Sequence, residues 1–200
     1  MTTLLIQTET VPLTVNLPSV QQMTEAQFYE FCQANRDLRI ERTANGEVIV
    51  MAPAFSDTGN RNLNIVAPLW YWTEENGSGI GFDSSAGFTL PNGAIRSPDA
   101  SWIQLDRWNA LTKAQQSSFA PICPDFVIEL RSASDRLNLL QDNLQEYIDN
   151  GARLGWLIDR KGRQVHVYRP GQAPKILDNP DQLSGDPELP GFVLRMEKIW

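Results

Sequence analysis

Two acidic residues interrupt apolar segments of the sequence and could bind a metal ion. Asp99 lies in Ser-Pro-Asp-Ala-Ser-Trp-Ile (97–103), and Glu129 lies in Pro-Asp-Phe-Val-Ile-Glu-Leu (124–130). A carboxylate among Val, Ile, Phe and Trp is costly to desolvate unless another group compensates its charge, and a hard divalent cation does so well. If the two segments form neighbouring strands, the pair predicts a Mg²⁺ or Mn²⁺ site.

A basic residue follows Glu129 at the spacing of side chains that share one face of a strand. Because side chains alternate along a strand, Glu129 and Arg131 are expected to project into one cleft. This layout is that of a metal-dependent nuclease with an Asp…Glu-X-Lys pattern, with arginine in the third place. Structural roles stay open: Asp99 could be a turn residue after Pro98, and Arg131 could pair with Glu129 or lie exposed at an edge.

The remaining pattern predicts the elements that must position these residues. Thr24 and Gln27 form a capping box, an Asn-Gly turn at 45–46 joins two β-rich segments into a hairpin, and Ser134-Asp135 caps a later helix. The expected helices cover 24–34, 59–73 (a buried helix kinked by Pro68) and 136–149, with a short one within 106–120. The expected strands cover 38–41, 48–51, 126–130, 154–158, 164–168, about 192–194 and, in one sheet, 79–83, 87–90 and 97–105.

Composition places the chain among folded globular proteins. Its 200 residues, 42 % hydrophobic and 20 % charged, suffice for one domain with a core. We expect a polar, Pro-punctuated arm over residues 1–22 and a single domain over 23–200. Cys32 and Cys123 match no metal-ligand spacing, so free thiols in a reducing cytoplasm are expected. No segment approaches the ~18 uninterrupted apolar residues of a membrane span, so no membrane is expected as a partner.

The net charge of −7 counts against a polyanionic partner. The charge is unevenly spread, however, because residues 121–170 hold as many Lys and Arg as Asp and Glu. A cation bound near Glu129 would add further positive charge to this neutral stretch. Nucleic acid therefore stays open as a partner, with weak and strongly salt-sensitive binding expected.

Other catalytic patterns are missing from the sequence. His166 is the only histidine, and its place in the alternating strand Gln-Val-His-Val-Tyr predicts an outward-facing, half-exposed side chain. No second histidine or suitable serine is present for a hydrolase triad, and no Gly-rich phosphate loop occurs. Trp70, Trp72, Trp102 and Trp156 lie in apolar runs and are expected in the core.

As a set, four segments resemble the Uma2 family of restriction endonuclease-like proteins, formerly a domain of unknown function and abundant in cyanobacteria. They are Arg-X-Pro-Asp (96–99), Pro-Asp-Phe-Val-Ile-Glu-Leu-Arg-Ser-X-Ser-Asp (124–135), Gln-Glu-Tyr-Ile-Asp-Asn-Gly (145–151) and Leu-Gly-Trp-Leu-Ile-Asp (154–159). The resemblance runs from about Met23 to Tyr168. It implies the PD-(D/E)XK nuclease fold, an α/β (α+β) domain whose mixed, largely antiparallel sheet is flanked by helices.

The resemblance also implies roles for individual residues. Asp99 and Glu129 match the family's metal-binding acids, and the carbonyl of Leu130 is expected to complete the metal site. Glu41, in Arg-Ile-Glu-Arg-Thr-Ala-Asn-Gly-Glu, is placed near the site, although acids are also common at hairpins. The family's basic residue stands on the helix after the glutamate, about 14 residues downstream, and Asn143 occupies that position.

The loss of that lysine changes the chemistry expected. A lysine can orient or help deprotonate the attacking water, whereas Arg131 or Arg136 could only stabilise the developing charge; Arg136 could equally be a solvated residue. We therefore expect a Mg²⁺-dependent endonuclease, a homodimer that hydrolyses nucleic acid, in particular DNA, more slowly than relatives that keep the lysine, or not at all. The alternative is a catalytically inactive nuclease-fold homodimer that acts as a binding or interaction module.

Overall fold

A six-stranded sheet forms the centre of the molecule in the computed structural model, which describes residues 13–15, 23–36, 38–51 and 55–200. The strand order is β11-β10-β9-β8-β7-β4, and only β8 and β9 run parallel. The sheet is thus mixed and largely antiparallel, as predicted. Its strands are β4 (Gly79–Asp83), β7 (Ala100–Gln104), β8 (Phe126–Leu130), β9 (Leu154–Asp159), β10 (Gln164–Tyr168) and β11 (Lys175–Asp178).

A second sheet of five short strands is built around the predicted hairpin, in the order β1-β3-β2-β6-β5. The prediction of one sheet for 79–83, 87–90 and 97–105 is wrong, because β5 and β6 pair with the hairpin while β4 and β7 join the large sheet. The chain changes sheets at Pro98, which has no N–H to continue a ladder. The strands are β1 (Leu13–Val15), β2 (Arg39–Arg42), β3 (Val48–Met51), β5 (Phe88–Thr89) and β6 (Ile95–Arg96).

The expected N-terminal arm contributes one element to this second sheet. Leu13–Val15 pairs antiparallel with β3, so the fold includes part of a segment that we expected to precede it. The other residues of the expected arm, 1–12 and 16–22, lie outside the described residues.

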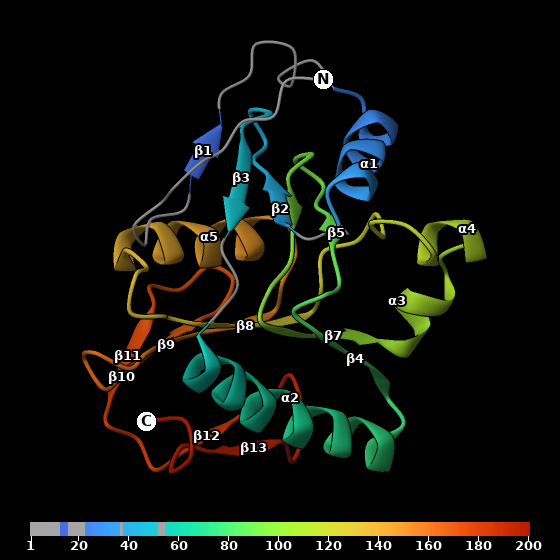
Figure 1. The fold of residues 1–200 in the computed structure, drawn as a ribbon. Helices are drawn as coiled ribbons and strands as arrows, with labels where there is room; N and C mark the ends of the chain where they lie inside the picture. The colour runs from blue at the N-terminus through green and yellow to red at the C-terminus, as the bar shows by residue number, and fades with distance from the viewer. Residues whose placement is uncertain (1–12, 16–22, 37, 52–54) are drawn as a thin grey trace.

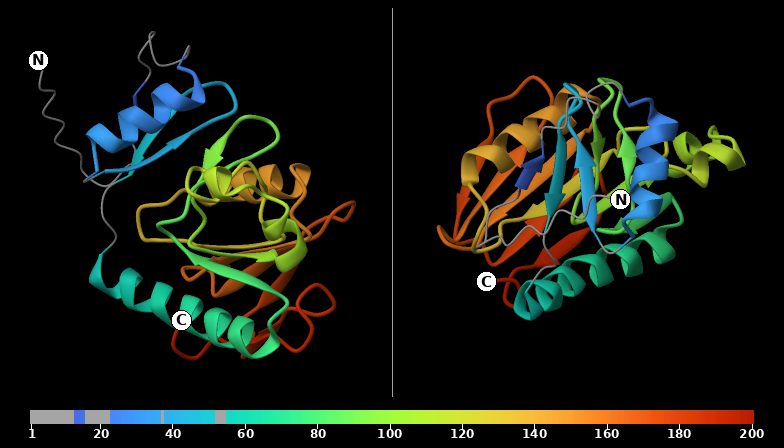
Figure 2. Two further views of the ribbon diagram at one scale, coloured as in Figure 1. Left: turned by 90° about the vertical axis from the view of Figure 1, so that its right-hand side faces the viewer. Right: turned by 45° about the horizontal axis from the view of Figure 1, so that its top comes forward.

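Helices cover both faces of the large sheet (Figure 1). The helix α2 lies on one face together with a small C-terminal sheet, whereas α5 and the five-stranded sheet lie over the other face (Figures 1 and 2). The helices are α1 (Glu25–Ala34), α2 (Ser56–Asn76), α3 (Leu105–Asn109), α4 (Lys113–Gln116) and α5 (Leu137–Asp149), and the small sheet consists of β12 (Gln182–Ser184) and β13 (Val193–Arg195).

The helix predictions hold in position but not in every detail. The capping box of Thr24 and Gln27 begins α1, as predicted. The residue before α5 is Arg136, with an extended backbone, so the predicted cap at Ser134-Asp135 is wrong. The Asp135 carboxylate instead accepts a hydrogen bond from the N–H of Ser132 at 2.7 Å.

Two apolar cores separate the large sheet from its covering layers. Even-numbered residues of β8, such as Ile128, pack with Ile65 and Leu69 of α2, and the odd-numbered Val127 packs with Leu144 of α5. Because parallel neighbours cannot be joined by a tight turn, α5 is the crossover between β8 and β9. Any odd-numbered polar side chain of β8 therefore lies beneath α5 and the five-stranded sheet.

Burial corrects two further predictions. Trp70 of α2 is 56 % exposed rather than in the core, whereas Trp102 and Trp156 are in the core as expected. His166 is only 4 % exposed rather than half-exposed. The alternation in β10 does not mark a solvated face here, since both faces of this sheet are covered.

Both cysteines are free thiols, as predicted, with Cys123 buried and Cys32 half-buried. Burial raises the pKa of Cys32 to about 11 and that of Cys123 to about 12, so both stay protonated near neutral pH. Across the part of the chain that the structure describes, no helix has the length and apolar character that crossing a bilayer requires.

Candidate active site

The structure brings Asp99 and Glu129 together on one face of the large sheet. Asp99 comes directly before β7, and Glu129 lies in the adjacent antiparallel strand β8. The carboxylate of Asp99 accepts a 2.9 Å hydrogen bond from the N–H of Leu130 at Oδ2. Both acids are nearly buried, at 9 % and 8 % exposure. The two residues singled out for interrupting apolar strands therefore share one buried site.

Two side chains from other elements bind the second oxygen of Asp99. Arg39 of β2 places Nη1 3.4 Å from Oδ1, and the amide of Asn62 on α2 donates to the same oxygen at 3.3 Å. Burial raises the pKa of Asp99, while the charge of Arg39 and the N–H of Leu130 oppose that rise. Asp99 is thus a buried carboxyl whose charge is only partly compensated.

Glu129 is compensated less well than Asp99. Among the residues that the structure describes, its hydrogen-bond partner is the hydroxyl of Tyr147 on α5, which donates to Oε1 at 3.3 Å. Burial, followed by the charges of Asp99 and Glu41, raises the pKa of Glu129 well above its ordinary value. Burial and the charge of Glu129 likewise raise the pKa of Tyr147, which keeps its proton as a donor.

Glu41 lies beside the two acids, as the resemblance implied, but in a closed ion-pair network. The N–H of Ser97 donates to Oε1 at 3.0 Å, and Arg96 Nη1 lies 3.2 Å from Oε2. Arg96 also places Nε 2.7 Å from Oε2 of Glu146 on α5. Burial acts to lower the pKa of Arg96, but the charges of Glu41 and Glu146 outweigh it and raise that pKa. We call Glu41, Arg96 and Glu146 the closed cluster.

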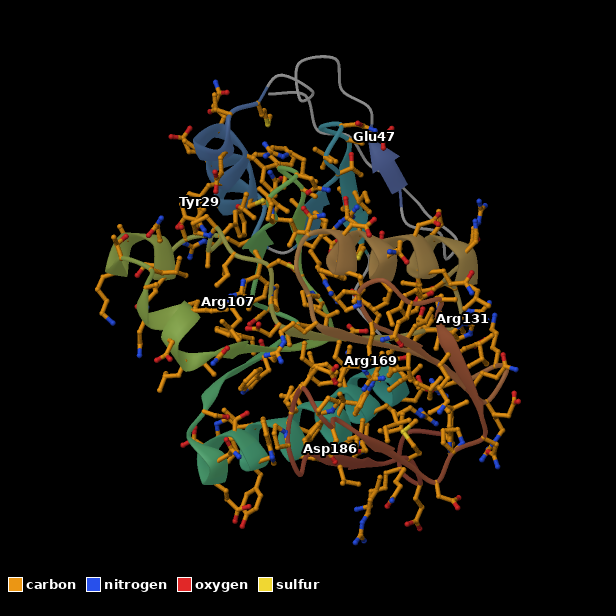
Figure 3. All side chains as sticks on the ribbon, turned by 180° about the vertical axis from the view of Figure 1, so that it is seen from behind. Tyr29, Glu47, Arg107, Arg131, Arg169 and Asp186 are labelled. Carbon is orange, nitrogen blue, oxygen red and sulfur yellow. The ribbon has the colours of Figure 1, made fainter. Side chains whose placement is uncertain are left out.

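Arg131 is held away from Glu129, with which it forms neither a hydrogen bond nor an ion pair. Its Nη1 lies 2.9 and 3.0 Å from the two carboxylate oxygens of Asp159, and its Nε donates to the carbonyl of Asp135. In Figure 3 Arg131 lies beside the strands at the edge of the large sheet. The structure therefore shows a structural partner for Arg131, and it is Asp159.

Asn143 lies on the side of α5 that faces the site. It precedes Glu146 and Tyr147 by three and four residues, the spacing of neighbours on one helix face, and these two residues contact Arg96 and Glu129. Asn143 is half-buried. Because α5 contains no Lys or Arg between Leu137 and Asp149, this helix brings no cation to the site.

The site as a whole carries excess negative charge. Four carboxylates, those of Glu41, Asp99, Glu129 and Glu146, face two guanidinium groups, so two negative charges remain when all are ionised. Within the described residues, no group of three or more His, Cys, Asp or Glu side chains is placed to hold a metal ion. A cation here would therefore use two carboxylates and backbone or water oxygens, which suits hard ions such as Mg²⁺ and Mn²⁺.

Five contributors to this site were not predicted from the sequence as site residues: Arg39, Asn62, Arg96, Glu146 and Tyr147. A signal existed for Arg39, since it precedes Glu41 by two residues and must share its strand face. Arg96 belongs to the Arg-X-Pro-Asp segment that carried the resemblance. No spacing in the sequence points to Asn62 or Tyr147, which reach the site from α2 and α5.

Comparison with known proteins agrees with the fold and with the earlier resemblance. Residues 25–197 match the family model Uma2, described as "Putative restriction endonuclease". A crystal structure from Anabaena variabilis ATCC 29413, titled as a putative nuclease belonging to DUF820, superposes with a TM-score of 0.63 at 23 % identity. The match covers 75 % of this chain and 82 % of that chain. No curated protein matches the sequence.

Proposed function

Because this chain belongs to the Uma2 family, we propose that the site around Asp99 and Glu129 hydrolyses phosphodiester bonds of nucleic acid, with DNA as the substrate. The observation that carries the proposal is the pair of buried carboxylates on adjacent strands, whose charges are incompletely compensated. Such a pair is costly to keep for stability alone, and perturbed buried acids of this kind gather at functional sites.

We assign metal binding to Asp99, Glu129 and the backbone carbonyl of Leu130. The donor set fits Mg²⁺ or Mn²⁺, because it consists of oxygen atoms and lies in a site with two excess negative charges when all its groups are ionised. When bound, such a cation supplies positive charge to the phosphate and lowers the pKa of a nearby water. The N–H of Leu130 and the amide of Asn62 orient the Asp99 carboxylate for this role.

The surrounding residues hold the two acids in place. Glu41 is bound to Arg96 and to the N–H of Ser97, so we assign it to positioning the segment that leads into Asp99. Tyr147 orients Glu129 through its hydroxyl. Arg131 is bound to Asp159, which supports a structural role rather than contact with the substrate.

Asn143 sets the expected rate. It faces the site from α5 but carries no charge and cannot take a proton from water at neutral pH. We therefore expect slow hydrolysis. The test is cleavage of supercoiled plasmid DNA in Mg²⁺ or Mn²⁺, in which Asn143→Lys is expected to raise the rate and Asp99→Asn to abolish cleavage.

A matched control separates a local effect from added positive charge. Gln145 lies exposed on the same helix, so Gln145→Lys adds the same charge away from the site and is expected to leave the rate unchanged. Rapid cleavage by the wild-type protein that neither Asn143→Ala nor Asp99→Asn slows would overturn the proposal.

The missing cation on α5 also favours a second candidate function, an inactive nuclease-fold homodimer that serves as a binding module in the cytoplasm. Calorimetric titration with Mn²⁺ distinguishes the two. Binding that Asp99→Asn removes supports the hydrolase. No binding by the folded wild-type protein supports the module, and the mass in sedimentation then tests whether it is a dimer.

A further inference from the structure

A phosphodiester is an anion, so the proposed site needs a protein cation that can reach it. The helix α5 supplies none. Two arginines contact the four acids of the site, Arg39 from β2 and Arg96 from β6. These two arginines differ in access to solvent and in the number of acids that bind them.

Arg96 cannot contact a phosphodiester substrate, because two carboxylates already bind its guanidinium group. Its side chain is 6 % exposed and contacts Glu41 and Glu146 at 3.2 and 2.7 Å. Withdrawing it toward a substrate would leave the buried Glu41 and the half-buried Glu146 without a cation, which is strongly unfavourable. Arg96 is therefore confined to the closed cluster.

Arg39 is bound more loosely than Arg96 and is more accessible to solvent. Its side chain is 32 % exposed, and its single ion pair, with Asp99, is long at 3.4 Å. One end of the guanidinium is anchored, because Nη2 donates to the carbonyl of Ser97. The Nε atom is buried and has no hydrogen-bond partner among the residues that the structure describes. The hydrogen bonds to Asp99 and Ser97 use one N–H of Nη1 and one of Nη2, so each Nη keeps a second N–H for a further acceptor.

The backbone aims Arg39 at the site. Arg39 and Glu41 alternate with Ile40 and Arg42 along β2, and the latter two face α1, where Arg42 lies 5.2 Å from the ring of Phe28. The first pair therefore faces the large sheet. Burial acts to lower the pKa of Arg39, but Asp99, Glu129 and Glu41 outweigh it and raise that pKa, so the group stays cationic.

We propose that Arg39 is a catalytic residue that contacts the scissile phosphate. Arg39 lies in the five-stranded sheet and supplies the positive charge that α5 lacks. This inference rests on the proposed function. Arg39 donates hydrogen bonds to phosphate oxygens and stabilises the charge that develops on them, and it neither forms a covalent bond nor transfers a proton. The carbonyl of Ser97 fixes its orientation during this contact.

The first test measures binding without turnover. The probe is a fluorescent DNA duplex with phosphorothioate linkages that resist cleavage, titrated in Mn²⁺ over a series of salt concentrations. Loss of one phosphate contact lowers the magnitude of the negative slope of log K against log salt by about 0.9. We expect this decrease for Arg39→Gln and a wild-type slope for the charge-conserving Arg39→Lys. The control is Arg36→Gln, which removes an exposed arginine just after α1 and should leave the slope unchanged.

The second test measures cleavage of a normal duplex. Arg39→Gln is expected to lower kcat by about 100-fold, the size of losing one donor to a developing oxyanion. Adding Asn143→Lys to Arg39→Gln is expected to restore kcat, because a cation then reaches the phosphate from α5. Thermal melting of each variant establishes that it is folded, and the charge-conserving Arg39→Lys supplies the comparison if Arg39→Gln unfolds.

The outcomes separate the two proposals. If the wild-type protein cleaves DNA and Arg39→Gln matches it in both slope and kcat, the role of Arg39 is overturned and the proposed function stands. An equal decrease for Arg36→Gln also overturns it, since the effect is then bulk charge. If the wild-type protein neither binds Mn²⁺ nor cleaves DNA, the proposed function fails, and the role of Arg39 fails with it.

Discussion

Two buried groups of charges lie side by side in this molecule and are compensated very differently. In the closed cluster, Arg96 is bound by Glu41 on one side and by Glu146 on the other. In the neighbouring group, Asp99 shares a long contact with Arg39, and within the described part of the chain Glu129 is bound by a tyrosine hydroxyl alone. The first group joins β2, β6 and α5, whereas the second leaves its acids with raised pKa values.

The difference separates a structural charge network from a candidate site. A buried ion pair that is fully bonded contributes to a unique arrangement of elements, and breaking it is costly. Two carboxylates held together with insufficient compensation are destabilising, and they are the kind of arrangement that a bound cation would relieve. Substitutions in the two groups are therefore expected to change the free energy of unfolding by amounts that differ in sign as well as in size.

The largest effect is expected in the closed cluster. Arg96→Met leaves the buried Glu41 and the half-buried Glu146 without a cation, so the free energy of unfolding should decrease by about 3–5 kcal/mol. Urea unfolding followed by tryptophan fluorescence measures this change. Arg36→Met, at an exposed site, is the matched control and should change it by less than about 0.5 kcal/mol.

The same substitution should act in opposite directions on two neighbouring glutamates. Glu129→Gln removes a poorly compensated charge and should raise the free energy of unfolding by about 1–2 kcal/mol, while abolishing Mn²⁺ binding. Glu41→Gln removes a charge that Arg96 needs and should lower the free energy of unfolding by a similar amount. Two values of the same sign in urea unfolding would contradict the comparison.

A smaller change in the free energy of unfolding is expected at Tyr147, the residue of α5 that contacts Glu129. Tyr147→Phe removes the hydroxyl that donates to Glu129, and the loss of a buried donor to a carboxylate costs about 1 kcal/mol or somewhat more. A double-mutant cycle with Glu129→Ala isolates the pair. A coupling energy of zero would show that the hydroxyl does not act through Glu129.

The smallest effect concerns a buried titratable group outside both clusters. Burial lowers the pKa of His166, and the charge of Asp159 opposes that shift. As pH falls through the ordinary histidine pKa near 6.5, the unfolded chain takes up the proton first, so the wild-type protein loses stability. The melting temperature of His166→Gln should therefore decrease less between pH 7.5 and pH 5 than that of the wild-type protein. Parallel pH profiles would mean that burial does not shift this histidine.

Local signals predicted most of the elements and the two central acids. The capping box, the Asn-Gly turn and the apolar segments are properties of a few consecutive residues, and the corresponding helices and strands are present. Asp99 and Glu129 were found because an acid in an apolar strand is energetically unusual at the level of sequence. The resemblance then placed Glu41, which no local pattern would have done.

The features that the sequence did not predict depend on how the layers of the fold pack against one another. Trp70 and His166 were assigned to the wrong environments because periodicity does not tell which faces are covered by distant segments. Asn62 and Tyr147 reach the site from helices on opposite faces of the sheet, at sequence separations of 37 and 18 from their partners. The strand β11 was not predicted, because its neighbours are rich in Pro and Gly.

The parallel pairing of β8 with β9 has a consequence for how this site can change over time. The crossover obliges α5 to pass over the sheet, so position 143 stays on the helix that covers Glu129 whatever residue occupies it. Codons for asparagine and lysine differ by one nucleotide. A single mutation at this codon could therefore add or remove a cation without redirecting the chain, so the proposed activity would be far easier to alter by drift than the fold itself.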